Sequence, residues 1–118
     1  MPLLKLQASI AQPLSELQVE FQKNAGLVLA KEIDKSVEFV LVIQEYDCNM
    51  SFGGKSNQPV AFFEIKNVGS LSNQVTQNLS IRLCKLCTEQ FGIPSDRIYL
   101  EFQESARTHW GWNGKTFG

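Results

Sequence analysis

The sequence has little cysteine, a single histidine and no excess of charge of either sign. Eleven basic and twelve acidic side chains give a formal net charge of -1 over 118 residues, and neither sign forms a run or a tail. Binding DNA or RNA requires a basic surface that neutralises phosphates, so no nucleic acid partner is expected. Three cysteines are an odd number, which favours free thiols over a disulfide framework. His109 has no clustered ligands beside it, so no metal site is expected.

Long apolar runs are also missing. The opening residues, Met-Pro-Leu-Leu-Lys-Leu, place a charge after only two leucines, unlike the basic start and apolar centre of a signal peptide. No later stretch approaches the roughly 20 apolar residues of a membrane-spanning helix, so no membrane association is expected. A cytoplasmic location is the default expectation, with secretion by a non-classical route left open.

The composition is that of a folded domain. With 43% hydrophobic and 19% charged residues, the chain from 1 to 118 is predicted to form one domain around one core. A domain of this size leaves much apolar surface in water, and its eight Phe, two Trp and two Tyr are suited to a subunit interface. Self-association is therefore expected.

Hydrophobic periodicity predicts two β-α-β units in succession, which is an α/β fold class. Apolar residues at helical spacing, beginning with Leu14 and Leu17, predict one helix over residues 13–31. A second stripe predicts a helix over residues 71–91, which Gly92 and Pro94 would end. Strands are predicted over residues 3–8, 38–44, 60–65 and 98–102. The runs at 38–44 and 60–65 are mostly apolar, with many β-branched and aromatic residues, as is typical of strands covered on both faces.

Glycine pairs predict two tight turns. Gly53 and Gly54 follow the second predicted strand and allow a sharp reversal of the chain. Asn113 and Gly114, flanked by aromatic residues, are a pair that favours a two-residue hairpin. Two strands alone are only marginally stable, so this C-terminal hairpin is expected to pack on the domain or on a neighbouring subunit.

Pro2 is the first candidate for chemistry. Removal of Met1 would leave a secondary amine at the start of the chain. An α-amino group has an ordinary pKa of about 7.7 to 8.0, so modest burial or a nearby cation would keep much of it neutral and basic at neutral pH. The simpler interpretation is that a proline merely follows the start codon, and taken alone the pair favours that interpretation.

Several short motifs, taken in order, favour the functional interpretation. Met1-Pro2 opens directly into a predicted strand, Lys35 follows the first helix, and Val68-Gly69 follows the third strand. The other motifs are Met-Ser-Phe-Gly-Gly at 50–54, Pro-Ser-Asp-Arg-Ile-Tyr at 94–99, Gly-Trp-Asn at 111–113 and Thr-Phe at 116–117. In this order and spacing the chain resembles the macrophage migration inhibitory factor and D-dopachrome tautomerase family over nearly its full length.

The resemblance implies a trimer-forming tautomerase fold. Each protomer would supply a four-stranded sheet with two helices on one face, plus the short C-terminal hairpin, and the active sites would lie at the subunit interfaces of a homotrimer. It also implies keto-enol tautomerisation of phenylpyruvate-like aromatic α-keto acids. The Pro2 nitrogen would act as base and then as acid, without a metal or an organic cofactor.

The resemblance also assigns residues to the site. Lys35 would meet the substrate's carboxylate or carbonyl, and its ammonium would lower the pKa of the Pro2 amine. Without the resemblance, Lys35 is one solvated lysine among charged neighbours. The pocket would be lined by the backbone at Val68, by Tyr99, and by Trp112 and Phe117 near its mouth. Core or interface packing is the alternative role for these four residues.

Two positions depart from the family pattern. Glu101 stands where mammalian members have asparagine, and a carboxylate there would repel an anionic substrate and raise the pKa of Pro2. The family's Cys-x-x-Cys falls on Val-Ala-Phe-Phe at 60–63, so its thiol-redox activity is not implied. Cys84 and Cys87 have the same spacing but lie inside the second predicted helix, where packing is favoured over redox chemistry.

The sequence is also compatible with two other functions. One is a cytokine-like module that binds a protein partner and retains only a vestigial pocket. The other is hydration or dehalogenation of unsaturated acids by the same proline, with Glu101 activating water.

Overall fold

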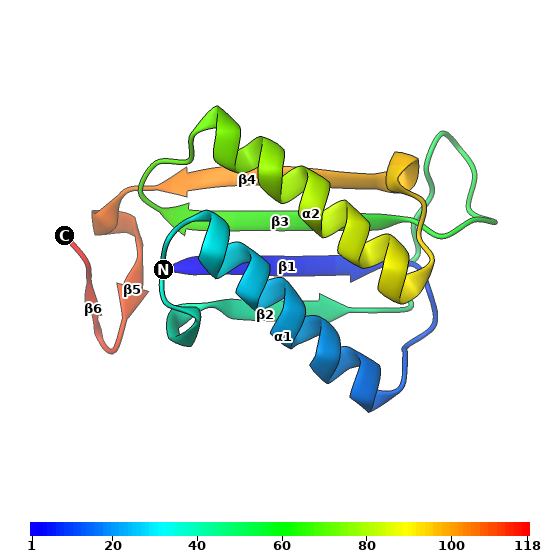
Figure 1. The fold of residues 1–118 in the computed structure, drawn as a ribbon, viewed down its shortest axis with the longest axis horizontal. Helices are drawn as coiled ribbons and strands as arrows, with labels where there is room; N and C mark the ends of the chain where they lie inside the picture. Colours follow the sequence, from blue (N-terminus) through cyan, green and yellow to red (C-terminus); the bar gives the residue numbers. More distant parts are fainter.

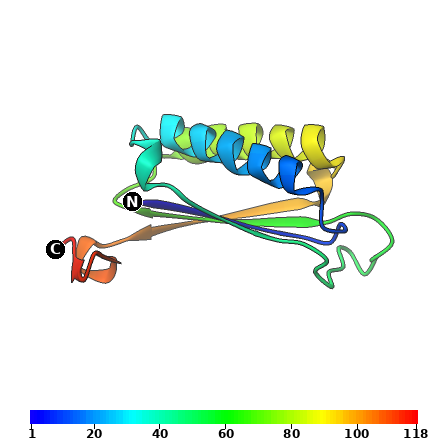
Figure 2. The same ribbon diagram turned by 90° about the horizontal axis from the view of Figure 1, so that it is seen from below.

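The computed structural model describes residues 1–118 and has two layers, a four-stranded sheet and two helices across one of its faces (Figure 1, Figure 2). The strands of the sheet are β1 (Pro2–Ala8), β2 (Leu41–Glu45), β3 (Ala61–Val68) and β4 (Ile98–Ser105). The helices are α1 (Ser15–Glu32) and α2 (Asn73–Phe91). Short 3-10 helices are η1 (Val37–Phe39), η2 (Ser95–Arg97) and η3 (Arg107–His109), and a separate hairpin consists of β5 (Gly111–Trp112) and β6 (Lys115–Thr116).

The sheet repeats one unit twice. Its order is β2-β1-β3-β4, with β1 parallel to β2 and β3 parallel to β4. The two halves meet where β1 and β3 pair antiparallel, and in that register Pro2 lies opposite Asn67. This arrangement confirms the predicted α/β fold of two β-α-β units with both helices on one face. It also fixes the start of the chain in the middle of one end of the sheet.

The core lies between the sheet and the helices and uses alternate strand residues. Leu4 and Leu6 of β1 and Phe63 and Ile65 of β3 point toward the helices and are fully buried. The helices contribute Phe21, Leu29, Leu79 and Leu83. Full burial of each such side chain stabilises the fold by about 1.5–3 kcal/mol. None of the helices is both long and apolar enough to cross a membrane.

The two helices end in different ways. Gly92 ends α2 with a left-handed φ of 68°, as predicted for a glycine cap. At the end of α1, Asp34 takes the left-handed φ of 55°, and the Lys35 N–H bonds back to the carbonyl of Ala30 at 2.9 Å. This backward bond reverses the chain and directs Lys35 toward the end of the sheet where β1 begins.

The predicted strand over residues 38–44 was wrong in extent and in burial. Glu38 and Phe39 lie in η1, because the Ser36 hydroxyl accepts a bond from the Glu38 N–H and starts a helical turn. The strand itself, β2, is at the edge of the sheet, and Leu41 is 55% exposed. Leu41 pairs with Leu3 and so lies on the face of the sheet that carries no helix (Figure 2), so an apolar run did not mean burial on both faces.

Other predicted boundaries also shifted. β3 runs on to Val68 and β4 to Ser105, because pairing between the two strands continues through polar residues such as Lys66 and Gln103. Leu14 and Leu17, which belonged to the predicted apolar stripe of the first helix, are 73% and 39% exposed. They precede the part of α1 that contacts the sheet.

Both predicted glycine turns are present. Phe52 and Lys55 pair across Gly53 and Gly54. The turn between β5 and β6 has left-handed φ angles of 54° at Asn113 and 82° at Gly114, the conformation that suits a two-residue hairpin. The hairpin packs on its own chain, because Trp112 contacts the ring of Phe39 edge-on at 5.9 Å between centroids.

Candidate active site

A cavity of about 340 Å³ opens at the end of the sheet where β1 begins. This volume is within the range that accommodates small organic ligands. The cavity is formed by both chain ends, by the segment after α1 and by the end of β3. Its lining residues are Met1, Pro2, Lys35, Ser36, Phe39, Val68, Arg107 and Phe117. The fold therefore brings together four of the predicted site residues, Pro2, Lys35, Val68 and Phe117.

Lys35 is held in the cavity by two neutral acceptors. Its Nζ donates to Asn67 Oδ1 at 2.8 Å and to the carbonyl oxygen of Val68 at 2.7 Å. The ion pairs of the chain involve other cations, so no carboxylate neutralises the ammonium. An ammonium has three N–H donors, and two are used here. The α-amino group of the chain is also within hydrogen-bonding range of Lys35, so what Lys35 offers a ligand is its unneutralised charge.

Asn67 is a site residue that sequence reasoning missed. It is only 3% exposed and occupies a position of β3 that faces the helices, in line with Phe63 and Ile65. A buried amide needs hydrogen-bond partners, and Lys35 supplies one. The signal was present in the sequence, since Asn67 is the polar member of an otherwise apolar alternating series.

The α-amino group of the chain lies in the same cavity. In the structure it belongs to Met1, and its pKa is lowered from 8.0 to about 6, first by burial and then by the hydrogen bond and the charge of Lys35. An amine with such a pKa is mostly neutral at pH 7 and is able to accept a proton. Pro2 is fully buried, and its nitrogen is in the peptide bond to Met1. Chemistry at the Pro2 nitrogen would therefore require removal of Met1.

Tyr99 and Glu101 do not reach this cavity within one chain. Both are exposed on the face of β4 that points away from the helices, Tyr99 to 66%. Glu104 of β4 pairs with Asn67 of β3, and Asn67 in turn pairs with Pro2 of β1. Glu104 is therefore the residue of β4 that lies beside the cavity end of the sheet. Five residues separate Tyr99 from Glu104, which in a strand is roughly 17 Å. Neither side chain therefore lines the cavity of its own chain.

Trp112 supports the rim of the cavity and does not line it. Its side chain is 51% exposed and stacks on Phe117 with the ring centroids 6.5 Å apart. Its other aromatic contact is Phe39. Phe39 and Phe117 both line the cavity, so Trp112 supports two of the aromatic side chains that form the cavity wall.

Three further lining residues were not predicted. Ser36 and Phe39 follow Lys35 and belong to the turn into η1, which was predicted as loop and strand. Arg107 begins η3, and its Nε donates to the carbonyl oxygen of Phe117 at 3.0 Å. No motif in the sequence marks Arg107, because its place in the cavity depends on how the C-terminal segment folds back.

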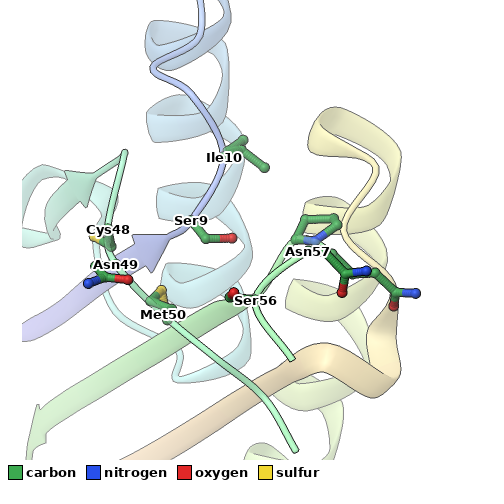
Figure 3. A pocket seen from close by; sticks show the side chains of 9 residues that line it. Ser9, Ile10, Cys48, Asn49, Met50, Ser56 and Asn57 are labelled. Atoms are coloured by element: carbon green, nitrogen blue, oxygen red, sulfur yellow. The ribbon is translucent and has the colours of Figure 1, made fainter. Parts of the chain in front are cut away.

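A second cavity, of about 450 Å³, lies at the opposite end of the sheet (Figure 3). It is lined by the segment after β1 and by the loop between β2 and β3, and none of its lining side chains carries a formal charge. Cys48 is its one thiol, and the Sγ contacts the carbonyl oxygens of Glu45 and Tyr46. Without a neighbouring base or cation, this cavity lacks the groups that the chemistry at Pro2 would need.

The remaining cysteines are packing residues in the structure. Cys87 is fully buried, and burial, followed by the charge of Cys84, raises the pKa of its thiol to about 12. Burial also raises the pKa of the Cys84 thiol. Because the thiolate is the reactive form, both environments disfavour redox chemistry. No group of three or more His, Cys, Asp or Glu side chains is placed to hold a metal ion.

Comparison with known proteins identifies the family. The family model described as macrophage migration inhibitory factor matches residues 1–118. The chain belongs to the macrophage migration inhibitory factor family. A family homolog from Brugia malayi is 30% identical over 118 residues, which is 100% of both chains. Macrophage migration inhibitory factor from Xenopus tropicalis is 33% identical over 90 residues, covering 76% of this chain and 77% of that protein.

Solved structures of the family share the fold. The macrophage migration inhibitory factor homologue from Prochlorococcus marinus aligns with a TM-score of 0.90 at 31% identity, covering 98% of this chain and 99% of that one. The macrophage migration inhibitory factor-like protein from Entamoeba histolytica aligns with a TM-score of 0.90 at 28% identity, covering 98% of each chain. The predicted family and its tautomerase-superfamily fold are thereby confirmed.

Proposed function

We propose that this member of the macrophage migration inhibitory factor family is a cofactor-independent keto-enol tautomerase that acts on phenylpyruvate-like aromatic α-keto acids. Removal of Met1 would free the Pro2 nitrogen, which serves as general base and then as general acid. The observation that carries the proposal is the immobilised, unneutralised Lys35 ammonium in the cavity that also holds the chain's α-amine.

The proton transfers balance within the site. In the ketonising direction the Pro2 nitrogen accepts the proton of the enol hydroxyl, and the protonated amine returns a proton to the adjacent carbon. The base must be neutral when the substrate arrives. The Met1 amine already has a pKa of about 6. The Pro2 amine that removal of Met1 would free lies in the same cavity as Lys35, and both burial and a nearby cation disfavour a protonated amine.

Lys35 supplies the electrostatic part of the mechanism. Asn67 and Val68 hold two of its N–H donors, and its positive charge would face the substrate's carboxylate or carbonyl oxygen. Because both protein partners are neutral, the ammonium retains its charge for the enolate that develops in the transition state. The fixed side chain needs little reorganisation during the reaction.

The walls of the cavity suit an aromatic substrate. Phe39, Val68 and Phe117 present apolar side chains around the cation and the amine. Aromatic rings pack edge-on or offset against such walls, while the acid end of the substrate faces the charged groups. These contacts would orient the α-carbon toward the Pro2 nitrogen.

We further propose that the working unit is a homotrimer, with Tyr99 and Glu101 of one protomer reaching the cavity of the next. The single chain leaves β2 with an unpaired edge and leaves Tyr99 largely exposed, as expected of surfaces that meet another copy. In that position the Glu101 carboxylate would weaken the binding of anionic substrates. Sedimentation should give three times the mass of the 13.3 kDa chain.

The catalytic part is tested by following enol-keto conversion of phenylpyruvate by ultraviolet absorbance. Pro2→Gly and Lys35→Ala should each lower kcat/KM by at least about a hundredfold, since they remove the base and the charge stabilisation. Lys85→Ala, which removes an exposed lysine on the outer face of α2, is the matched control and should behave as wild type. Intact mass spectrometry must first establish that Met1 is removed.

Three results would contradict the proposal. Wild-type activity of Pro2→Gly would exclude the proline mechanism. Retention of Met1 in the active protein would do the same. Absence of turnover across α-keto acids, together with saturable binding of a protein partner, would favour a cytokine-like binding function instead.

The shared site is tested by mixing two variants that each lack one of the two residues. Pro2→Gly and Tyr99→Ala would be unfolded together and refolded, so that mixed trimers form. If each site combines Pro2 of one protomer with Tyr99 of the next, about a quarter of the sites in a random mixture regain both residues. No recovery of activity in mixed trimers would contradict a site that combines Pro2 of one protomer with Tyr99 of the next.

A further inference from the structure

Arg107 is a second cation in the cavity, and it also lacks a carboxylate partner. No acidic side chain lies within ion-pair distance of its guanidinium. Two hydrogen bonds join it to Phe117: its Nε donates to the Phe117 carbonyl oxygen at 3.0 Å, and its own carbonyl oxygen accepts the Phe117 N–H at 3.2 Å. The guanidinium is therefore attached to the cavity wall through its Nε.

This attachment leaves the binding face of the arginine free. A guanidinium carries five N–H donors, and the Nε–Phe117 bond uses one of them. The two terminal nitrogens form the planar fork that binds a carboxylate through two parallel hydrogen bonds. Because the stem is already fixed, less side-chain freedom is lost when an anion binds.

The charge that one chain contributes to the cavity is therefore unbalanced. Lys35 and Arg107 are its two cationic side chains, and none of the other lining residues is acidic. Lys35 is already assigned to the keto acid end of the substrate. A monoanion such as phenylpyruvate neutralises Lys35 and leaves Arg107 without a partner, unless the Glu101 carboxylate of a neighbouring protomer reaches it.

We propose that Arg107 determines substrate specificity and that the cavity prefers α-keto acids with a second carboxylate. The keto acid end lies at Lys35 and the second carboxylate at Arg107, with the apolar walls between them. This inference rests on the proposed tautomerase function and narrows its substrate class. Arg107 binds the end of the substrate that does not react, so it acts on KM more than on kcat.

The test compares phenylpyruvate with phenylpyruvates that carry a carboxylate at the meta or para ring position. Wild type should favour at least one of the carboxylated substrates by roughly tenfold or more in kcat/KM, as expected for a charge-assisted bidentate contact. Arg107→Gln should abolish that preference through KM, and Arg107→Lys should keep part of it. Lys85→Gln removes the same charge from the outer face of α2 and should keep all of it.

Added salt gives a second readout of the same contact. The preference of the wild type should shrink as ionic strength rises, because the Arg107 side chain is exposed and its charge is screened. Near-ultraviolet circular dichroism should be unchanged in Arg107→Gln if Phe117 and the stacked Trp112 keep their places.

Two outcomes would overturn the inference. An equal loss for both substrate types in Arg107→Gln would mean that Arg107 only positions Phe117. The second outcome is that Arg107→Gln no longer changes the substrate preference when it is combined with Glu101→Gln. The partner of Arg107 would then be a carboxylate of a neighbouring protomer.

The failure of the proposed function is distinguishable from the failure of this inference. If wild type converts none of these keto acids, the tautomerase proposal fails, but binding can still be measured with benzoate, isophthalate and terephthalate. Tighter binding of a dicarboxylate, lost in Arg107→Gln, would support a site for dianions. Equal binding of mono- and dicarboxylates would overturn it.

Discussion

Replacing Asn67 by aspartate should disable the candidate base while preserving the fold. The two side chains have nearly the same shape, and the new carboxylate would take the place of the amide oxygen that now lies 2.8 Å from Lys35 Nζ. The ammonium would then be neutralised by the protein and not by the substrate. Asn67 also lies opposite Pro2 in the strand register, so the carboxylate would stabilise the protonated amine.

The size of the effect follows from Coulomb's law. Opposite residues of an antiparallel pair have Cα atoms about 5 Å apart, which sets a distance of roughly 6 Å between the new charge and the amine. At an effective dielectric constant of about 20, two unit charges at that distance interact by about 3 kcal/mol, which is about a hundredfold in the protonation equilibrium of the amine. Lys35 offsets part of this, so we expect at least about a tenfold loss of kcat/KM at pH 7.

The assay is phenylpyruvate tautomerisation across pH, with amine protonation followed by NMR of protein labelled with ¹⁵N-proline. The activity of Asn67→Asp should recover as pH rises above the raised pKa of the amine. Asn57→Asp adds the same charge at the cavity on the opposite end of the sheet and is the control (Figure 3). Wild-type activity and unchanged amine protonation in Asn67→Asp would refute the idea that the Lys35–Asn67 contact tunes the base.

Three further predictions concern pH and stability. Wild-type kcat/KM should stay level from pH 8 to 7 and fall only as the pH drops through the lowered pKa of the amine, which is about 6 for Met1. The reason is that only the neutral amine is a base. A fall in kcat/KM that begins near pH 8 would contradict this prediction. Arg97→Met should lower the free energy of unfolding by about 2–4 kcal/mol, because the buried guanidinium donates to the carbonyls of Lys55, Gln58 and Pro59. Chemical denaturation measures this free energy. A loss below about 1 kcal/mol would argue against a stabilising role of these hydrogen bonds. Gly92→Ala should lower the free energy of unfolding by about 1 kcal/mol through backbone strain alone, since a methyl group there meets nothing within 4 Å. An unchanged unfolding midpoint in urea would show that alanine fits the end of α2 without strain.

Periodicity was sufficient to predict the elements and their duplication. The helices and strands follow from spacings of apolar residues, and Gly92, Asn113 and Gly114 adopt the left-handed angles that their residue types favour. The burial of individual strands was less predictable, because an apolar run does not reveal which face of the sheet the helices cover. The predicted strand over residues 38–44 was wrong in burial for that reason. It was wrong in extent because the Ser36 hydroxyl caps η1, which takes in the first residues of that range.

The candidate site was only half predictable. Pro2 and Lys35 were identified by the resemblance to the family, and Asn67 was visible as a polar interruption of a buried series. Arg107 depends on the path of the C-terminal segment, which no local pattern encodes. The fold of one protomer does not bring Tyr99 and Glu101 to the cavity, and the roles proposed for them require a second chain.

Met1 and Phe117 line one cavity, so both termini of the chain open onto the candidate site. For protein production, an affinity tag fused to Met1 would acylate the amine and fill the entrance, and a tag after Gly118 would crowd the wall that Phe117 forms. A tag inserted between Gly53 and Ser56, in the loop at the far end of the sheet, avoids both problems (Figure 1). Recombinant preparations that differ only in the position of their tag should therefore differ in activity.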